Sequence, residues 1–415
     1  MVLKDVYPEV LKCSKCGFCQ PTCPTYTVSG REHEVARGRN QLVRAVSEGV
    51  LDLTRELKDP LFQCLMCNAC YTNCFPAIKT DRVIAAARSE YIKRYGQPAL
   101  QRYIFKNLLR NPARLGRYLK LASFGKRSGI SGLVQVLRVL GWFGKNIANS
   151  EDLMETIPKS SLRDRIKSKP LVPNVRRGKI AYFVGCGINF AQPEVGLATI
   201  EIMLKRGFEV SVLPNVCCGL PAYAYGDLDS VLWFAALNAR ILADSDADVI
   251  VTDCGSCTSF LKEYVHIFDD NEVATEFRAE KVMDFTTWLR DTADLARFVE
   301  STPVRVTYHD PCHLAHHLKE KEAPRQVLRR LPSADFVELN ESDFCCGGAG
   351  SYNIAHYDIS MKILQRKVKN VESSGANVLT TACPACLIQL NYGMRKYKLP
   401  VAIRHLSQFV LERSE

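Results

Sequence analysis

The placement of cysteine constrains this chain more than any other feature of its sequence. Eight of the 18 cysteines fall in two tight runs within the first 80 residues, none lies at positions 81–175, and ten are spread over residues 176–415. A disulfide scaffold would be shorter and richer in cysteine than this chain of 415 residues. The first ten residues lack the pattern of a signal peptide, so the thiols are expected to be reduced, and clustered cysteines then predict metal binding.

The two N-terminal runs have the spacing of two-cluster ferredoxins. One reads Cys13-x2-Cys16-x2-Cys19-x3-Cys23-Pro24 and the other Cys64-x2-Cys67-x2-Cys70-x3-Cys74, with a helical pattern between them over Glu34–Glu48. In such pairs, three closely spaced cysteines bind one cubane and the fourth binds the other. The prediction is therefore two [4Fe–4S] clusters, one held by Cys13, Cys16, Cys19 and Cys74 and the other by Cys64, Cys67, Cys70 and Cys23. Paired zinc knuckles are the alternative, although they use two C-x2-C units and four ligands.

The remaining ten cysteines form an internal repeat. The first set is Cys186, Cys217, Cys218, Cys254 and Cys257, and the second is Cys312, Cys345, Cys346, Cys383 and Cys386. Each unit alternates predicted strands with helical patterns, which indicates a parallel α/β domain built twice, with cysteines beyond the carboxyl ends of the strands. The predicted strands are Lys179–Val184, Glu209–Leu213 and Asp248–Thr252, then Val304–Tyr308, Phe336–Leu339 and Asn377–Thr381; the predicted long helices are Ser230–Ala243 and His356–Val371.

Local phrases of this repeat resemble the CCG domain. They are Val184-Gly185-Cys186, Cys217-Cys218-Gly219-Leu220-Pro221, the sequence YHDPCHL at 308–314, and Cys345-Cys346-Gly347-Gly348-Ala349-Gly350. Two ferredoxin runs followed by two CCG units are similar to the glycolate oxidase iron–sulfur subunit and to the catalytic subunits of heterodisulfide reductases across nearly the whole chain. The resemblance implies a further iron–sulfur cluster in each CCG domain, of a non-cubane type, bound by all ten C-terminal cysteines. A cubane with one spare thiol per domain, or metal in only one domain, stays open as an alternative.

The chain resembles the glycolate oxidase subunit more closely than the heterodisulfide reductase, as judged from residues 308–317, 350–353 and 387–390. It implies an iron–sulfur electron-transfer subunit of an FAD-linked 2-hydroxy-acid (glycolate or lactate) dehydrogenase, passing electrons from a flavoprotein partner to a quinone or another carrier. No P-loop and no Gly-x-Gly-x-x-Gly after a strand is found in the sequence, so flavin and substrate oxidation are expected on the partner. The complete Cys254–Cys257 pair, often missing in oxidase-type subunits, keeps open a heterodisulfide reductase-type catalytic subunit. A zinc-stabilised scaffold without redox activity is a third hypothesis.

Four histidines surround Cys312: His309, His313, His316 and His317. One hypothesis gives them proton supply or hydrogen bonds to cluster sulfur. For all except His313, we favour a polar turn between strand and helix, with Asp310 as the helix cap.

Residues 91–150 contain twelve lysines and arginines and no acidic residue, in a chain of net charge +11. Leu100, Ile104 and Leu108 fall at helical spacing, and Leu115 and Leu119 resume it after Pro112. This pattern predicts a basic helical linker. We rank docking of an acidic partner first, contact with an anionic membrane surface through residues 93–145 second, and a solvated linker without a partner third. Nucleic-acid binding is not expected.

The longest apolar stretch, residues 131–144, is short and broken by Arg138, so no membrane span is predicted. A cytoplasmic location is expected, with peripheral contact at the inner face of the membrane kept open. The predicted organisation is a helical ferredoxin domain at 1–92, the basic linker at 93–175, a first CCG domain at 176–300 and a second at 301–415.

Overall fold

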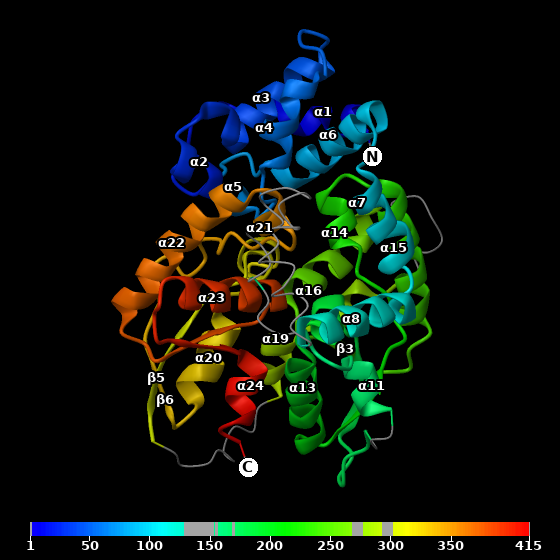
Figure 1. Ribbon diagram of the computed structural model, residues 1–415, viewed down its shortest axis with the longest axis vertical. Helices are drawn as coiled ribbons and strands as arrows, with labels where there is room; N and C mark the ends of the chain where they lie inside the picture. Colours follow the sequence, from blue (N-terminus) through cyan, green and yellow to red (C-terminus); the bar gives the residue numbers. More distant parts are fainter. Residues whose placement is uncertain are drawn as a thin grey trace.

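The computed structural model describes residues 2–127, 153, 157–167, 171–267, 277–292 and 302–414. A helical N-terminal part sits above two α/β units that lie side by side (Figure 1). Arg138, Lys145 and the apolar stretch 131–144, all part of the basic segment in the sequence, lie outside the described residues.

Among its described residues, the N-terminal part consists of helices and loops without strands, as its sequence pattern predicts. Val10, Val43, Leu61, Val83 and Ile84 are buried in its core. The first cysteine run lies around the loop before α2 and the second in the segment between α4 and α6, so short helices and loops hold the thiols at the lower end of this part. The helices are α1 (Leu3–Leu11), α2 (Pro24–Ser29), α3 (Ala36–Ser47), α4 (Lys58–Phe62), α5 (Ala69–Thr72) and α6 (Thr80–Tyr95).

Each α/β unit contains a four-stranded parallel sheet, and the two sheets have the same topology. The orders are β2-β1-β3-β4 and β6-β5-β7-β8. Ile180 pairs with Val210 and Val249, and Val306 pairs with Phe336 and Val378. The strands are β1 (Gly178–Tyr182), β2 (Phe208–Val212), β3 (Val249–Thr252), β4 (Val282–Asp284), β5 (Val304–Tyr308), β6 (Ala334–Phe336), β7 (Val378–Thr381) and β8 (Ala402–His405).

All six predicted strands are present, with one clear shift. The strand predicted at Phe336–Leu339 ends at Phe336, because only residues 334–336 pair with β5 and the chain then turns Glu338 toward Arg325. The short outer strands β4 and β8 were not predicted from the sequence. The predicted long helices are observed as α15 (Leu228–Ala243) and α22 (Tyr357–Ser374), and the left-handed Gly375 (φ +63°) ends the latter.

Helices cover the sheets and also join the two units. In the first unit they are α12 (Cys186–Phe190), α13 (Pro193–Lys205), α14 (Leu220–Ala224), α15, α16 (Gly255–Lys262), α17 (Tyr264–Ile267) and α19 (Phe285–Asp291). In the second they are a π-helical turn (His313–His317), α20 (Glu322–Arg330), α21 (Tyr352–Ala355), α22, α23 (Pro384–Lys396) and α24 (Leu406–Leu411).

The two units exchange equivalent contacts across their interface. Helix α24 packs on α13 while α19 packs on α20, and α16 packs on the π-helical turn while α12 packs on α23. Gly255 lies at this interface: its N–H donates to the Ala382 carbonyl at 3.0 Å, and a β-carbon there would lie 3.1 Å from Leu314 Cβ. This packing brings the cysteine-bearing edges of both sheets together.

The described part of the basic segment is a helical layer on the first unit. It consists of α7 (Ala99–Tyr103), a π-helical turn (Ile104–Leu108), α8 (Pro112–Arg127) and α11 (Leu162–Ile166). Phe105 is buried against Tyr225, and the Arg110 guanidinium lies 4.7 Å from the Trp233 ring centroid. Among the described residues, no helix combines the length and apolarity needed to cross a membrane.

Candidate metal centres

Two cavities in the N-terminal part are lined by cysteines of both runs. Cys13, Cys16, Cys19 and Cys74 line the first, together with Cys70. The second is lined by Cys64, Cys67, Cys70 and Cys23. Ala36, Cys70 and Thr80 line both cavities, so the two are adjacent. Each cavity thus combines the three closely spaced cysteines of one run with the fourth cysteine of the other.

The second cavity adjoins the cysteines of the second α/β unit. Cys67 and Leu65 form one buried cluster with Phe344 and Cys345, against which Cys312 packs. Burial, followed by the nearby Cys345 and Cys312 thiols, raises the pKa of Cys67 well above its ordinary value. Tyr352 closes this interface, and its hydroxyl donates to the Gln63 carbonyl at 3.0 Å.

The cysteines of the two α/β units also meet. Ser256, between Cys254 and Cys257, has its Oγ 3.6 Å from Cys383 Sγ of the other unit. Within the first unit, Cys186 Sγ lies 3.9 Å from Cys217 Sγ.

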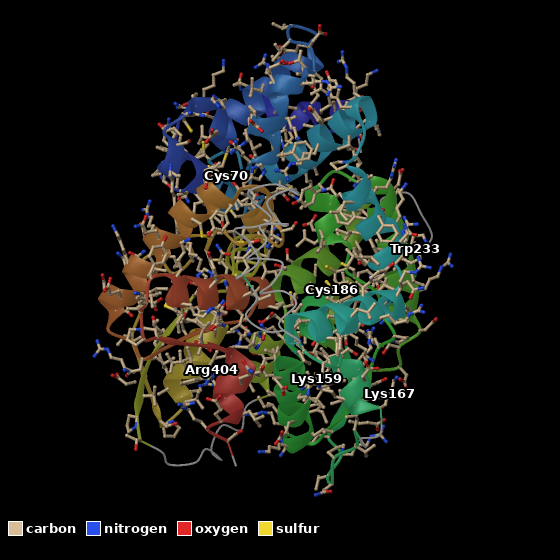
Figure 2. All side chains as sticks on the ribbon, in the orientation of Figure 1. Cys70, Lys159, Lys167, Cys186, Trp233 and Arg404 are labelled. Atoms are coloured by element: carbon tan, nitrogen blue, oxygen red, sulfur yellow. The ribbon has the colours of Figure 1, made fainter. Side chains whose placement is uncertain are left out.

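These contacts place the four cysteine sets in series. Figure 2 labels Cys70 at the lower end of the N-terminal part and Cys186 in the first unit, which is the last unit of the series. The cavity lined by Cys186 and Cys217 is also lined by Leu109, Pro112 and Leu115, so the basic segment covers this last set.

Each of three cysteine sets has a cation nearby, which is buried beside two of the sets and half-buried at the third, where it is Arg163. Arg39 and Arg88, 1% and 3% exposed, lie beside the second cavity; Lys367, 0% exposed, lies near Cys345 and Cys346; Arg163 lines the cavity of Cys186. Their hydrogen bonds go to uncharged groups: Lys367 donates to the Glu341 and Ser342 carbonyls, and Arg163 donates to the Leu213 and Asn215 carbonyls at 2.9 Å. Within the described part of the chain, none of the four forms an ion pair.

A buried charge without a counter-charge costs several kcal/mol (about 3–5). Burial lowers the pKa of Lys367 to about 8 and that of Arg88 to about 10, so both stay cationic at neutral pH. Thiolate-ligated iron–sulfur clusters carry negative charge, and such a cluster beside each cation would supply the missing counter-charge. The residues present therefore fit clusters in the α/β units as well as in the N-terminal part.

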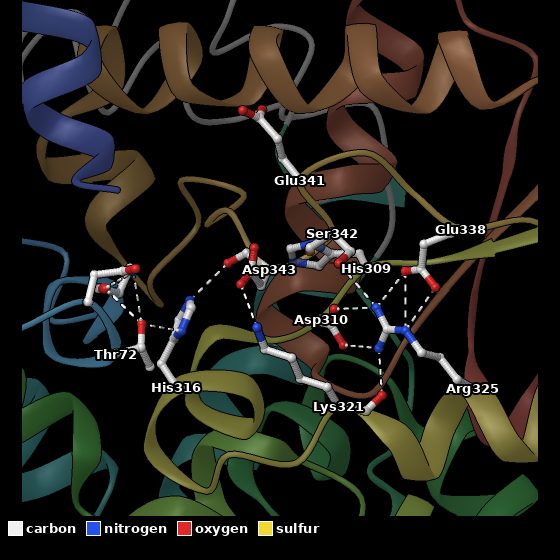
Figure 3. A network of polar contacts seen from close by, with 12 residues as sticks. Thr72, His309, Asp310, His316, Lys321, Arg325, Glu338, Glu341, Ser342 and Asp343 are labelled. Atoms are coloured by element: carbon white, nitrogen blue, oxygen red, sulfur yellow. Dashed lines mark hydrogen bonds and ion pairs between the residues drawn. The ribbon is translucent and has the colours of Figure 1, made fainter. Parts of the chain in front are cut away.

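The surroundings of Cys312 differ from the prediction. Asp310, expected to cap a helix, is instead fully buried and accepts hydrogen bonds from Arg325 at 2.9 and 2.8 Å; Arg325 also pairs with Glu338 at 2.6 Å (Figure 3). The prediction was wrong because the cap position is taken by the backbone of Cys312, while the Asp310 carboxylate turns toward α20. Burial acts to lower the pKa of Arg325, but its hydrogen bonds to Asp310 and Glu338 raise it.

The histidines of this turn have contacts that differ in kind. His313 Nδ1 lies 3.6 Å from Cys312 Sγ and 3.3 Å from Ser256 Oγ, and its ring stacks on His317. His316 Nε2 donates to the Asp343 carbonyl at 3.1 Å, and its Nδ1 lies 3.5 Å from the Thr72 hydroxyl of the N-terminal part (Figure 3).

The sequence interpretation missed the buried cations, although their positions carry a signal. Lys367 follows Leu364 by three residues and precedes Val371 by four, so it lies on the apolar face of α22. Arg88 likewise follows Ile84 and Ala87 on the buried face of α6. Both buried cations could have been identified as charged residues at positions that helical periodicity assigns to the core.

A helical part with two cysteine-lined cavities, joined to two α/β units whose cysteines adjoin, defines an iron–sulfur subunit of an oxidoreductase. The family model of the 4Fe-4S dicluster domain matches residues 9–78, and that of the cysteine-rich CCG domain matches residues 180–262 and 306–391. The chain belongs to the family of glycolate oxidase iron–sulfur subunits, to which a subunit of heterodisulfide reductases is related. The resemblance and the fold class expected from the motifs are confirmed.

Three relatives support this assignment. A "Probable glycolate oxidase iron-sulfur subunit" of Bacillus subtilis is 31% identical over 97% of this chain and 94% of its own length. "Lactate utilization protein A" of Geobacillus thermodenitrificans is 31% identical over 57% of this chain and 100% of its own length. A chain of the "Dihydromethanophenazine:CoB--CoM heterodisulfide reductase" of Methanosarcina acetivorans is 24% identical over 97% of this chain and 94% of its own length.

Proposed function

We propose that this chain is the electron-transfer subunit of an FAD-linked 2-hydroxy-acid dehydrogenase of glycolate or lactate type, and that it passes electrons from a flavoprotein partner to a quinone or another carrier. The observation that carries the proposal is the series of four cysteine sets, from the N-terminal cavities through the second α/β unit to the first. Clusters bound there would accept and release single electrons. The names of the glycolate oxidase and lactate utilization relatives support the substrate class.

The proposed ligand sets follow the cavities. Cys13, Cys16, Cys19 and Cys74 would hold one cubane, and Cys64, Cys67, Cys70 and Cys23 the other. The five cysteines of each α/β unit would hold one further cluster per unit, with Arg163 and Lys367 as nearby positive charges. The same organisation supports the proposed domain limits at 1–92, 93–175, 176–300 and 301–415.

Anaerobically purified protein is expected to contain about sixteen irons and as many acid-labile sulfides per chain, four for each of four clusters. About eight irons would contradict clusters in the α/β units. A colourless, iron-free protein would contradict the whole proposal in favour of a zinc scaffold.

Pairs of cysteine substitutions test the crossed ligation within the same assay. Cys16→Ser and Cys74→Ser remove ligands of one cubane, so the double variant should lose about four irons, no more than either single variant. Cys16→Ser with Cys23→Ser should lose about eight. The reverse pattern would show that each run holds its own cluster.

A second candidate function is reduction of a disulfide substrate by the α/β units. It is favoured by one observation: both units carry all five cysteines, and the two sets adjoin at Ser256 and Cys383. EPR of the thiol-oxidised protein discriminates between the two functions. A signal that develops only with a disulfide or thiol substrate would favour the reductase, and its absence would favour the hydroxy-acid relay.

The basic layer is proposed to dock an acidic surface of the flavoprotein partner, with an anionic membrane as the other occupant. Its helix α8 combines exposed Arg117 with Leu121 and Phe124, each 70% exposed. Exposed apolar side chains among cations with no acidic residue between them fit a partner of opposite charge.

Charge reversal on this layer is expected to weaken binding. Arg102→Glu, Lys106→Glu and Arg117→Glu together should lower affinity for the flavoprotein about tenfold at low salt, since exposed ion pairs contribute roughly 0.5 kcal/mol each. The matched control reverses Arg329, Lys362 and Lys369 on the second unit. Binding that is unchanged to both the flavoprotein and anionic vesicles would contradict docking through this layer, and loss of vesicle binding alone would assign it to the membrane.

A further inference from the structure

His309 stands where the first unit has a phenylalanine. It follows β5, and its backbone N–H donates to the Thr380 carbonyl at 2.9 Å; Phe183 follows β1 and donates to the Val251 carbonyl at 2.9 Å. Both residues precede the first cysteine of their unit by three positions. They therefore occupy equivalent places at the cysteine-bearing edge of the two sheets, but only His309 offers a nitrogen.

The contacts of the His309 ring define which nitrogen carries the proton. Nδ1 lies 3.0 Å from the Ser342 carbonyl oxygen (Figure 3). A carbonyl oxygen can only accept, so Nδ1 is the protonated nitrogen and Nε2 keeps its lone pair. The same carbonyl accepts a hydrogen bond from Lys367 at 3.2 Å.

The lone pair of Nε2 has no partner. His309 is 0% exposed, and Nε2 is buried without a hydrogen bond among the described residues. The ligand atoms offered by His309, Cys346 and Cys386 lie within 4.8 Å of one another. An unsatisfied buried acceptor destabilises the folded protein, and a bond to a metal would relieve that cost. A histidine whose other nitrogen is held by a backbone carbonyl is the usual arrangement of a metal ligand.

We propose that His309 Nε2 is a sixth protein ligand of the second α/β unit and binds an iron of the cluster held by Cys312, Cys345, Cys346, Cys383 and Cys386. The inference rests on the proposed function, because it requires a cluster in this unit. The first unit has Phe183 at the same place and offers sulfur ligands only. The two α/β clusters are therefore chemically different, and a neutral imidazole keeps the potential of the second cluster higher than a thiolate at the same position would.

Nitrogen hyperfine spectroscopy tests this directly. Full-length protein is purified anaerobically with natural-abundance or ¹⁵N-labelled histidine, its iron content is measured, and each EPR signal is examined by pulsed methods. We expect a directly coordinated histidine nitrogen on one α/β signal, with the coupling altered by the ¹⁵N label. The coupling should vanish in His309→Cys, which keeps a ligand at the position, and the potential of that signal should fall.

Two other histidines provide controls. His313 is close to Cys312 Sγ, and both ring nitrogens of His316 have partners, but neither residue is a proposed ligand. The variants His313→Gln and His316→Gln should therefore keep the coupling and the potential. Fully iron-loaded wild-type protein without any histidine coupling would overturn the His309 assignment and leave the proposed function standing. Coupling that survives in His309→Cys would also overturn it. Wild-type protein that lacks iron in the α/β units would overturn both.

Discussion

Replacement of Arg88 by methionine is expected to lower the free energy of unfolding of the cluster-loaded protein by about 3–5 kcal/mol, the range for removing one partner of a buried, hydrogen-bonded charge. Arg88 Nη2 donates to the Leu61 and Cys64 carbonyls at 2.7 and 2.6 Å, and Nη1 donates to the Ala224 carbonyl of the first α/β unit. One side chain thus joins α6, the loop of the second cysteine run and the first unit.

The Arg88 contacts lie where the backbones of the N-terminal part and the first unit are in close contact. Gly226 has φ +79°, and a β-carbon there would lie 2.5 Å from the Ser89 backbone nitrogen. Methionine at position 88 cannot satisfy the three carbonyls across so tight an interface, so loss of iron from the second N-terminal site should accompany the loss of stability.

Denaturant unfolding under anaerobic conditions, with iron analysis of the same samples, measures both effects. Arg94→Met is the matched control, because Arg94 is exposed on the same helix, and its effect should stay within about 0.5 kcal/mol. In iron-depleted protein, Arg88→Met should lower the free energy of unfolding by less, because no cluster then provides a negative charge for the buried cation. A cost below about 1 kcal/mol in the loaded protein, with full iron, would contradict the assigned role.

Replacement of Arg325 by methionine is the second change with a large expected effect. It would leave the fully buried Asp310 without its bidentate partner, and the expected cost is again about 3–5 kcal/mol. Asp310 lies between His309 and Pro311, next to Cys312, so the second α/β cluster should also lose iron or change its EPR signal.

A double-substitution cycle separates the buried pair from other effects of Arg325. Arg325→Met combined with Asp310→Asn should recover part of the lost stability, because the neutral amide is less costly to bury than an unpaired carboxylate. Arg329→Met on the same helix is the control; its guanidinium lies 5.4 Å from the Phe336 ring centroid and is exposed. Strictly additive effects of the two substitutions on the free energy of unfolding would contradict an interaction between Arg325 and Asp310.

Much of the fold was readable because its signals are local. The strands before Cys186 and Cys312 are short β-branched and aromatic runs, and the five matching cysteines reveal the duplication. The outer strands β4 and β8 were missed because each is only three or four residues long and no cysteine motif follows it. The strand at Phe336 was placed too late because its apolar pattern continues beyond the residues that pair with β5.

The candidate sites could also be predicted from local signals, but only as far as those signals reach. Cysteine spacing determines which thiols can reach one cluster, since it is a property of a few consecutive residues. The sequence alone thus determined the family, the four cysteine sets and the α/β duplication. Their order in space was decided by the tertiary structure, through the packing of Cys67 against Cys345 and of Ser256 against Cys383.

The tertiary structure alone also decided the charges and the nitrogen beside those sets. The sequence analysis assigned no role to Arg88 or Lys367, which packing buries without acidic partners. His309 read as part of a polar turn until the Ser342 carbonyl oriented its ring and left Nε2 unpaired. These features depend on residues far apart in the chain. Burial makes an unpaired charge or an unsatisfied lone pair more costly than it is in water, and burial exists only in the packed molecule.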